Sequence, residues 1–302
     1  MNQQFLTELK AVTAENRIFT DEQMKKHTTF RVGGPADILV QPKGTELASV
    51  IRLCRKYDVP YQVIGNGSNL LVGDRGIRGL VIEMLSKEDE ICVGDDCITV
   101  GAGMLLSKTA NRAADHGLTG MEFAAGIPGS IGGAVVMNAG AYGGEMKDIL
   151  TAVTVLDQEG NEKILSAEEL ELGYRTSCIL KKGYIVTGAK IKLKHGEETA
   201  IRARMEELKK QRVEKQPLEY PSAGSTFKRP EGYFAGKLIM DAGLRGYLVG
   251  EAQVSEKHCG FVINRGNATA ADVRTLMQNV ADIVEEKFGV RLEPEVKMIG
   301  EF

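Results

Sequence analysis

The sequence predicts an α+β protein with about two domains, and three observations support this class. The chain has 302 residues, which is enough for two hydrophobic cores. Short strand-like runs are mixed with segments whose apolar residues recur at helical spacing. Finally, Gly65 and Gly67 form a G-x-G after a strand-like run, but no third glycine follows and residues 70–72 continue as a strand. The last observation argues against a nicotinamide-type Rossmann domain.

The first hundred residues mix helix and strand. Apolar residues at helical spacing predict an N-terminal helix within residues 1–20, and residues 36–42 form the next strand-like run. A helix is predicted from residue 45 to Pro60, where proline ends it; its buried residues would be Leu47, Val50, Ile51 and Cys54. Further strands are predicted on both sides of the glycine turn at 65–69, at 79–84 and within 91–101.

The rest of the chain continues this mixture. A helix at 105–118 precedes the glycine-rich region 117–146, and residues 152–165 read as a β-hairpin that turns at Glu159-Gly160-Asn161. After a strand at 184–194, a charged helix ends at Pro217 and marks a domain boundary. The C-terminal part has an amphipathic helix with Thr269 and Asp272 as its capping pair, and a last strand at 291–300. The apolar stripe of that helix comprises Val273, Leu276, Met277, Val280, Ile283 and Val284.

Composition excludes several classes of function. A net charge of −3 without a basic block argues against nucleic acid as the main partner. The five cysteines are odd in number and lack C-x-x-C spacing, which predicts reduced core thiols in a cytosolic protein. The four histidines share no spacing, so no metal is expected. The N-terminus has no apolar run of signal or membrane length, so no membrane association is expected either.

Two glycine-rich stretches carry the strongest chemical signal, "VIGNGSNLLV" at 63–72 and "AAGIPGSIGGAVVMNAGAYGGE" at 124–145. Glycines weaken a regular element, but they let the backbone approach a ligand and offer N–H groups to it. Tight turns against a sheet are the alternative interpretation. Two such stretches, each with an uncharged amide, suit a ligand that carries a pyrophosphate and a flat ring. No Walker lysine is present, so binding would depend on dipoles.

Six blocks occur in the order typical of one enzyme family: "TTFRVGGPAD", "VIGNGSNLLV", "GIPGSIGGAVVMNAGAYGGE", "YRTS", "AGSTFKRP" and "LEPEVKMIG". Together they span about residues 28–300, and they resemble the UDP-N-acetylenolpyruvoylglucosamine reductase (MurB) family. No tyrosine-bearing loop is inserted after "AGSTF", so the chain is more similar to the shorter, second type of this enzyme. Which aromatic residue covers the sugar nucleotide is therefore left open.

The resemblance implies a fold and a division of the chain. It implies an FAD-binding domain of the vanillyl-alcohol-oxidase (PCMH) type, made of two subdomains, followed by an α+β substrate domain. On this plan the N-terminal helix occupies residues 1–20, the two FAD-binding subdomains occupy 21–104 and 105–196, and the substrate-binding domain occupies 197–302.

The resemblance also implies a reaction. NADPH would reduce FAD, and the reduced flavin N5 would pass hydride to C3 of UDP-N-acetylglucosamine enolpyruvate, which gives UDP-N-acetylmuramate for peptidoglycan synthesis. The cofactor supplies the redox chemistry, and the protein supplies orientation, charge and a proton. The product serves cell-wall biogenesis, and through it cell shape and cell division.

Three residues match the catalytic set of the family. Ser225 would protonate C2, although by spacing alone Ser222 or Thr226 is an equal candidate. Arg175 would pair with the substrate carboxylate and stabilise the enolate. Glu295 would orient the enolate site or its proton relay. Strand alternation places Glu293, Glu295 and Lys297 on one side, so periodicity cannot choose between the two glutamates.

The remaining candidates bind ligands. The expected substrate contacts are Lys228 and Asn264, together with Arg212 and Lys215, for which a solvated helix face is the alternative. Tyr174 would line the channel, or it is a core tyrosine. The expected FAD contacts are Ile64, Gly65, Asn66, Gly67, Ser68, Asn69, Leu70, Ala125, Gly126, Pro128, Gly129, Ser130, Gly132, Gly133, Asn138, Ala139, Gly140 and Gly143.

Two rival functions are compatible with parts of the sequence. One is an FAD oxidase of the same superfamily, but the glycine blocks contain no histidine or cysteine to link the flavin. The other is a nucleotide-sugar-binding module without turnover, which would not need the complete catalytic set. The sequence and the resemblance together favour a cytoplasmic, monomeric reductase.

Overall fold

The computed structural model describes residues 3–85 and 91–302. Residues 1–2, in the predicted N-terminal helix, and residues 86–90, in the predicted first subdomain, lie outside the described residues. The chain forms two compact units that are interleaved in sequence. Unit 1 comprises residues 1–19, 38–66 and 79–212, and unit 2 comprises residues 20–37, 67–78 and 213–302. The predicted FAD-binding subdomains and substrate-binding domain stay predictions, because these units are defined by contacts within the chain and not by ligand binding.

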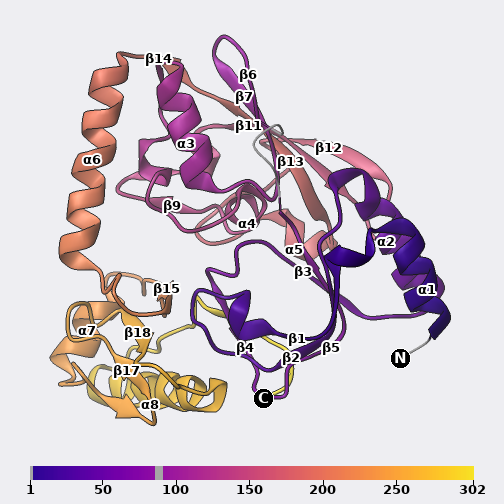
Figure 1. The fold of residues 1–302 in the computed structure, drawn as a ribbon. Helices are drawn as coiled ribbons and strands as arrows, with labels where there is room; N and C mark the ends of the chain where they lie inside the picture. Colours follow the sequence, from indigo (N-terminus) through magenta and orange to yellow (C-terminus); the bar gives the residue numbers. More distant parts are fainter. Residues whose placement is uncertain (1–2, 86–90) are drawn as a thin grey trace. The chain divides into compact units, whose positions relative to one another are not determined.

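A four-stranded sheet has the order β1-β2-β5-β3. These strands are β1 (Ile18–Gln23), β2 (Pro35–Val40), β5 (Ile77–Glu83) and β3 (Tyr61–Ile64), and the first three each contain a unit boundary. Helices α1 (Gln3–Val12) and α2 (Gly44–Lys56) lie side by side (Figure 1) and bury their apolar faces in one core with this sheet. The short 3-10 helix Glu15–Arg17 follows α1.

The larger sheet of unit 1 has five antiparallel strands in the order β12-β11-β13-β7-β6. Their bounds are β12 (Glu162–Ser166), β11 (Leu150–Leu156), β13 (Ile185–Lys192), β7 (Cys97–Gly101) and β6 (Ile91–Val93). Its core includes residues of α3 (Leu106–Asp115), α4 (Ile131–Val136) and α5 (Cys178–Lys182). The small pairs are β8 (Leu118–Thr119) with β14 (Lys194–His195) and β9 (Gly140–Ala141) with β10 (Gly144–Glu145), and the 3-10 helices are Glu122–Ala124 and Met146–Asp148.

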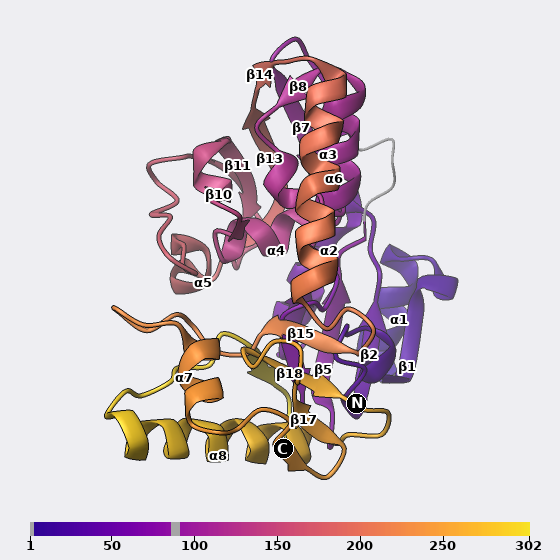
Figure 2. The ribbon, with the colours of Figure 1, turned by 90° about the vertical axis from the view of Figure 1, so that its left-hand side faces the viewer.

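Helix α6 (Glu198–Lys215) begins in unit 1 and contains the last boundary, after Arg212. Only Ile201 and Leu208 are buried on it, and Met205 is partly buried against the core of the large sheet. An ion pair between Arg202 and Asp115 joins α6 to α3, and Figure 2 shows the two helices side by side.

Unit 2 has a sheet with the order β15-β18-β17-β16, and helix α8 (Ala270–Phe288) runs along it (Figure 2). The strands are β15 (Ser222–Ser225), β18 (Phe261–Asn264), β17 (Ala252–Val254) and β16 (Leu248–Val249), and α7 (Ala235–Asp241) also packs on α8. A separate parallel pair joins β4 (Leu70–Val72) to β19 (Lys297–Ile299). The hydrophobic core of unit 2 includes Phe30, Val32 and Leu71, which lie far from the C-terminal segment in the sequence. The 3-10 helix Met24–Lys26 completes the unit.

Most of the predicted elements are confirmed. Helix α2 buries all four predicted residues, and α8 has the predicted capping box between Thr269 and Asp272. On α8 the predicted stripe is buried except Ile283, which is only partly buried. The prediction of core thiols was wrong for two of the five cysteines, because Cys92 is exposed and Cys97 is half-buried on the β6–β7 hairpin. Within the described residues, no helix is long and apolar enough to cross a membrane.

Candidate active site

The two glycine stretches meet within unit 1. The Asn66 side chain donates a hydrogen bond to the Pro128 carbonyl, with an N–O distance of 2.6 Å. A Cβ atom added to Gly65 would lie 2.0 Å from the Ser130 hydroxyl oxygen, so no larger residue fits there. The two stretches are therefore in direct contact.

Gly67 begins the part of the first stretch that belongs to unit 2. Its φ is +60°, a left-handed conformation that glycine adopts without strain. A Cβ atom there would also lie 2.0 Å from the His27 carbonyl oxygen. The turn before β4 thus needs glycine at Gly67 for both conformation and space.

The second stretch is fixed against the segment that follows β7. The Gly132 N–H donates to the Ala102 carbonyl at 2.7 Å, and the Ile131 N–H donates to the Met104 carbonyl at 2.8 Å. The Ser130 hydroxyl caps α4 by accepting from the Gly133 N–H at 3.4 Å. Several backbone N–H groups of this stretch are therefore already paired within the protein.

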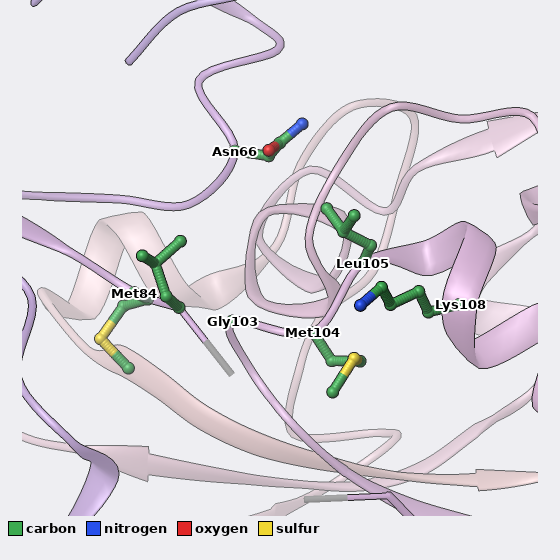
Figure 3. A pocket seen from close by; sticks show the side chains of 7 residues that line it. Asn66, Met84, Gly103, Met104, Leu105 and Lys108 are labelled. Carbon is green, nitrogen blue, oxygen red and sulfur yellow. The ribbon is translucent and has the colours of Figure 1, made fainter. Parts of the chain in front are cut away.

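A cavity of about 170 Å³ lies where these segments come together (Figure 3). Apolar side chains and glycine backbone form most of its wall, and Asn66 and Lys108 add an amide and an ammonium group. Whole-ligand pockets commonly measure roughly 300–1,000 Å³, so this cavity suits a ring or another part of a large ligand. Its lining residues are Asn66, Met84, Leu85, Gly103, Met104, Leu105 and Lys108.

Asn138 supports the shape of the second stretch from inside. It is fully buried with φ +45°, and its amide donates to Glu145 at 2.7 Å and to the Gly173 carbonyl at 3.1 Å. Its oxygen accepts from the Lys147 N–H at 2.9 Å. These bonds occupy both N–H donors of the amide and one lone pair of its oxygen, so the Asn138 side chain holds the second stretch in place.

Arg175 lies in a two-residue turn that touches the second stretch. Gly173 and Thr176 exchange backbone hydrogen bonds of 3.1 and 3.3 Å around Tyr174 and Arg175. Arg175 has φ +54° at the third position, where a type II turn normally has glycine. Its guanidinium reaches the Gly140 carbonyl at 3.5 Å and lies 5.2 Å from the Tyr174 ring centre. Tyr174 itself is 55% exposed, which excludes the alternative of a core tyrosine.

Arg212 also contacts the second stretch, whereas the Lys215 side chain makes no hydrogen bond or ion pair within the described residues. The Arg212 guanidinium donates to the Gly126 carbonyl and lies 5.9 Å from the Tyr142 ring centre. A Cβ atom on Gly126 would lie 3.0 Å from Arg212 Nε. Lys215 is exposed in the last turn of α6. Arg212 is thus a structural neighbour of the candidate cofactor loop, and Lys215 occupies a solvated helix face.

In unit 2, the structure separates the three candidate hydroxyls. Thr226 is buried, and its hydroxyl oxygen accepts from the Val262 N–H at 2.9 Å. The Ser222 carbonyl accepts from the Thr29 hydroxyl at 2.7 Å. Ser225 ends β15, is exposed, and its hydroxyl makes no hydrogen bond within residues 3–85 and 91–302. Among the three, Ser225 is the hydroxyl at an exposed strand end.

The predicted alternation at residues 291–300 was wrong. Only Lys297–Ile299 form a strand, because Pro294 lacks an N–H group and interrupts the ladder. Glu295 is buried, at 8% exposure, whereas Glu293 is exposed and forms an ion pair with Lys228. The two glutamates therefore differ in the structure, although periodicity placed them on one side.

Glu295 contacts Thr226, the residue after Ser225, through the backbone. The Glu295 N–H donates to the Thr226 carbonyl at 2.8 Å. The Asn69 amide donates to the Glu295 carbonyl at 3.1 Å, and the Lys297 N–H donates to the Asn69 carbonyl at 2.9 Å. Unit 2 thus brings together the end of the first glycine stretch, the segment of Glu295 and the strand of Ser225.

The two predicted substrate contacts in unit 2 have structural partners. Lys228 Nζ lies 3.0 Å from the Glu293 carboxylate, and this hydrogen bond holds the pKa of Glu293 below its ordinary value. Asn264 is 1% exposed, and its amide donates to the Phe30 carbonyl at 3.2 Å. Its oxygen accepts from two N–H groups of the following turn. Glu293 uses one of the three N–H donors of Lys228, and the Asn264 side chain is bonded to Phe30 and to the turn that follows it.

Comparison with known proteins decides the family. The profile for the C-terminal domain of UDP-N-acetylenolpyruvoylglucosamine reductase matches residues 216–299, and an FAD-binding domain profile matches residues 36–166. The reductase of Agathobacter rectalis is 57% identical over 314 aligned residues that cover 100% of both chains. This chain belongs to the UDP-N-acetylenolpyruvoylglucosamine reductase family.

Other members of the family agree with this assignment. The reductase of Lachnoclostridium phytofermentans is 56% identical and covers 100% of this chain and 99% of its own length. The crystal structure of the reductase from Thermus caldophilus superposes with a TM-score of 0.79 at 41% identity, covering 92% of this chain and 97% of that one. The chain is thus an FAD-binding oxidoreductase, and its fold is the predicted FAD-binding domain followed by a C-terminal α+β domain.

Two groups of residues near the candidate residues were not predicted from the sequence. In unit 1 it is the wall of the cavity after β7, for which the G-x-G at Gly101 and Gly103 was the available signal. In unit 2 it is the turn of His258, in which the Gly260 carbonyl accepts from the Thr226 N–H. The four histidines share no spacing, so the sequence contains no signal for His258.

Proposed function

We propose that this chain reduces UDP-N-acetylglucosamine enolpyruvate to UDP-N-acetylmuramate with NADPH, in peptidoglycan precursor synthesis. The observation that carries the proposal is the pairing in unit 2 of an exposed Ser225 with the buried Glu295 segment, through the 2.8 Å bond from Glu295 N–H to the Thr226 carbonyl. The names of the relatives supply the substrate class.

The residues at the junction of the glycine stretches would hold FAD. Gly65 and Gly67 let the backbone approach, and the cavity beside Asn66 and Lys108 accommodates part of the ligand. When bound, FAD supplies hydride transfer from NADPH to C3 of the enolpyruvyl group.

Protein side chains would complete the reaction at C2. Ser225 gives its hydroxyl proton to C2, and the proton is restored from solvent by a relay that includes Glu295. Arg175 pairs with the substrate carboxylate, where negative charge accumulates before protonation. The overall balance is one NADPH and one proton consumed for each C=C bond reduced.

The decisive experiment separates the two half-reactions under anaerobic conditions. NADPH should bleach the flavin absorption of the purified protein, and UDP-N-acetylglucosamine enolpyruvate should restore it. In Ser225→Ala, bleaching should stay within about threefold of wild type, while reoxidation should slow about a hundredfold or more, as expected for a lost general acid. Ser222→Ala removes a hydroxyl three residues earlier and serves as the matched control.

Either of two results would refute the proposal. Wild-type flavin that the enolpyruvyl substrate cannot reoxidise would exclude the reaction. Normal reoxidation in Ser225→Ala would keep the reaction but remove Ser225 as the proton donor.

A further inference from the structure

His258 lies in the turn between β17 and β18, which is fixed to the residue after Ser225. The Thr226 N–H donates to the Gly260 carbonyl at 2.9 Å. The Ser255 hydroxyl oxygen accepts from the N–H groups of Lys257 and His258, each at 3.2 Å. The backbone of this turn is therefore held from both sides.

The imidazole ring of His258 is held by packing. It meets the Phe261 ring edge to face, with ring centres 5.0 Å apart and an interplanar angle of 69°. Phe261 is the cross-strand partner of Ser225. A Cβ atom on Gly260 would lie 2.9 Å from His258 Cε1, so glycine is what allows this close approach.

The hydrogen bonding of the ring fixes where its proton lies. The Gly260 N–H donates to His258 Nδ1 at 3.1 Å, so Nδ1 is an acceptor and the neutral ring carries its proton on Nε2. Burial lowers the pKa of His258, which also favours the neutral ring. The Nε2–H group is therefore a fixed hydrogen-bond donor.

That donor is not used within the protein. Nε2 has no hydrogen-bond partner in the described part of the chain, and no buried side-chain nitrogen there lacks one. Nε2 is consequently open to solvent. Arg245 donates to the Glu256 carbonyl in the same turn and adds a positive charge nearby.

We infer that His258 Nε2 donates a hydrogen bond to an anionic oxygen of the bound nucleotide sugar and so positions the substrate at Ser225. A histidine that served packing alone would need only the Phe261 contact and the Nδ1 bond. The fixed tautomer, the rigid ring and the solvent-open donor together fit recognition of an acceptor on a ligand. The inference rests on the proposed function, because it assumes that Ser225 meets this substrate.

Three substitutions of His258 distinguish the hydrogen-bond donor at Nε2 from the packing of the ring. In His258→Gln the side-chain amide nitrogen can replace the donor Nε2. In His258→Asn the amide oxygen can replace the acceptor Nδ1, but no group reaches the position of Nε2. In His258→Phe the ring remains without donor or acceptor. We expect His258→Asn and His258→Phe to raise the substrate KM about tenfold or more, with kcat changed less than threefold, as for a lost hydrogen bond to a charged group. His258→Gln should restore most of the affinity.

The controls use flavin reduction and a second histidine. Flavin reduction by NADPH should be the same in all three variants, and His195→Asn on exposed β14 should leave the substrate KM unchanged. In wild type, the ¹⁵N signal of Nε2 should shift on addition of UDP-N-acetylmuramate.

Several outcomes would overturn the inference. One is a His258→Gln variant as impaired as His258→Phe, which would mean that exact ring packing matters. Another is a wild-type substrate KM in all three variants. A third is a Nε2 signal that product does not move. Each is distinct from failure of the proposed function, in which the substrate would not reoxidise wild-type flavin at all.

Discussion

At the scale of single residues, Arg175 has a left-handed backbone conformation that favours glycine. A non-glycine residue with left-handed φ costs roughly 1–2 kcal/mol, and such strain often persists where a side chain is needed. Arg175 has φ +54°, and Glu171, four residues earlier, has φ +50°. The two positions allow strain and chemistry to be tested separately.

We predict that Arg175→Gly leaves the free energy of unfolding unchanged or raises it by up to about 1 kcal/mol, because glycine relieves the strain but gains entropy in the unfolded chain. The same change should slow flavin reoxidation by the enolpyruvyl substrate about a hundredfold, through loss of charge stabilisation. Glu171→Gly should give a similar stability effect with normal reoxidation. Denaturant unfolding and stopped-flow absorbance would measure both. Normal reoxidation in Arg175→Gly would show that the guanidinium is not used.

Asp157 provides a pH prediction at the β11–β12 turn. Its carboxylate accepts from the N–H groups of Asn161 and Glu159 at 2.9 and 3.0 Å and lies 3.2 Å from Lys163 Nζ. These partners, the Asn161 hydrogen bond first, lower its pKa from 3.8 to about 2. A lowered pKa means that the stabilisation is complete above pH 3.8 and is lost as the pH falls through about 2.

Wild type and Asp157→Asn should therefore differ in melting temperature by a constant amount above about pH 5, and this difference should shrink as the pH falls toward 2. Thermal melting from pH 2 to 7 would measure it. A difference that does not change with pH would show that the charge of Asp157 contributes nothing to stability.

Residue identity predicted some of the site but not its geometry. The glycines at 65 and 67 identified the loop, because only glycine meets its steric demands. Strand periodicity could not distinguish Glu293 from Glu295, because their burial depends on the contact of Glu295 with Thr226, about 70 residues away in the chain. The hydrogen-bond partners of the Asn138 and Asn264 side chains could not be predicted for the same reason, since tertiary structure determines them.

At the scale of elements, the start of α8 has two independent caps. The Thr269 and Asp272 box is local. The Asp74 carboxylate, which follows β4, accepts from the N–H groups of Ala270 and Ala271 at 2.7 and 2.9 Å. A carboxylate at this end also complements the helix dipole.

Asp74→Ala should therefore lower the free energy of unfolding by about 1–2 kcal/mol. Asp282→Ala is the matched control, because Asp282 accepts an exposed hydrogen bond from Gln278 within the same helix. It should lower the free energy of unfolding much less than Asp74→Ala. Chemical denaturation would measure the free energy of unfolding of both variants. Equal losses would mean that the distant cap adds nothing to the local box.

The elements that were predicted best are those whose signals are local. Helix α8 carries its capping box, its stripe and its terminal Gly289 within about 20 residues of sequence. The failed strand at 291–300 contains Pro294 and runs beside Phe227, so its conformation is determined by a partner that periodicity cannot reveal.

At the scale of the whole molecule, the interleaving of the units was not predictable from composition. The C-terminal core of residues 213–302 includes Phe30, Val32 and Leu71 from two earlier segments. Strand β19 pairs with β4 rather than with a neighbour in sequence. The domain boundary near residue 200 was predicted because the sequence of α6 is highly charged. The two earlier segments of unit 2, residues 20–37 and 67–78, do not differ in composition from their neighbours.

A fragment of residues 213–302 should therefore not fold by itself, because it lacks these core side chains, the partner of β19 and the Asp74 cap. Circular dichroism should show no cooperative thermal transition for the fragment, in contrast to the full chain. A sharp transition would show that the borrowed segments are dispensable.

The first glycine stretch has a consequence for cooperativity. Asn66 is bonded to Pro128 in unit 1, and Asn69, three residues later, is bonded to the Glu295 segment in unit 2. Only Gly67 and Ser68 separate these two attachments. A ligand that orders this short loop would stabilise both units at once, so cofactor occupancy and the order of the Glu295 segment would be thermodynamically linked.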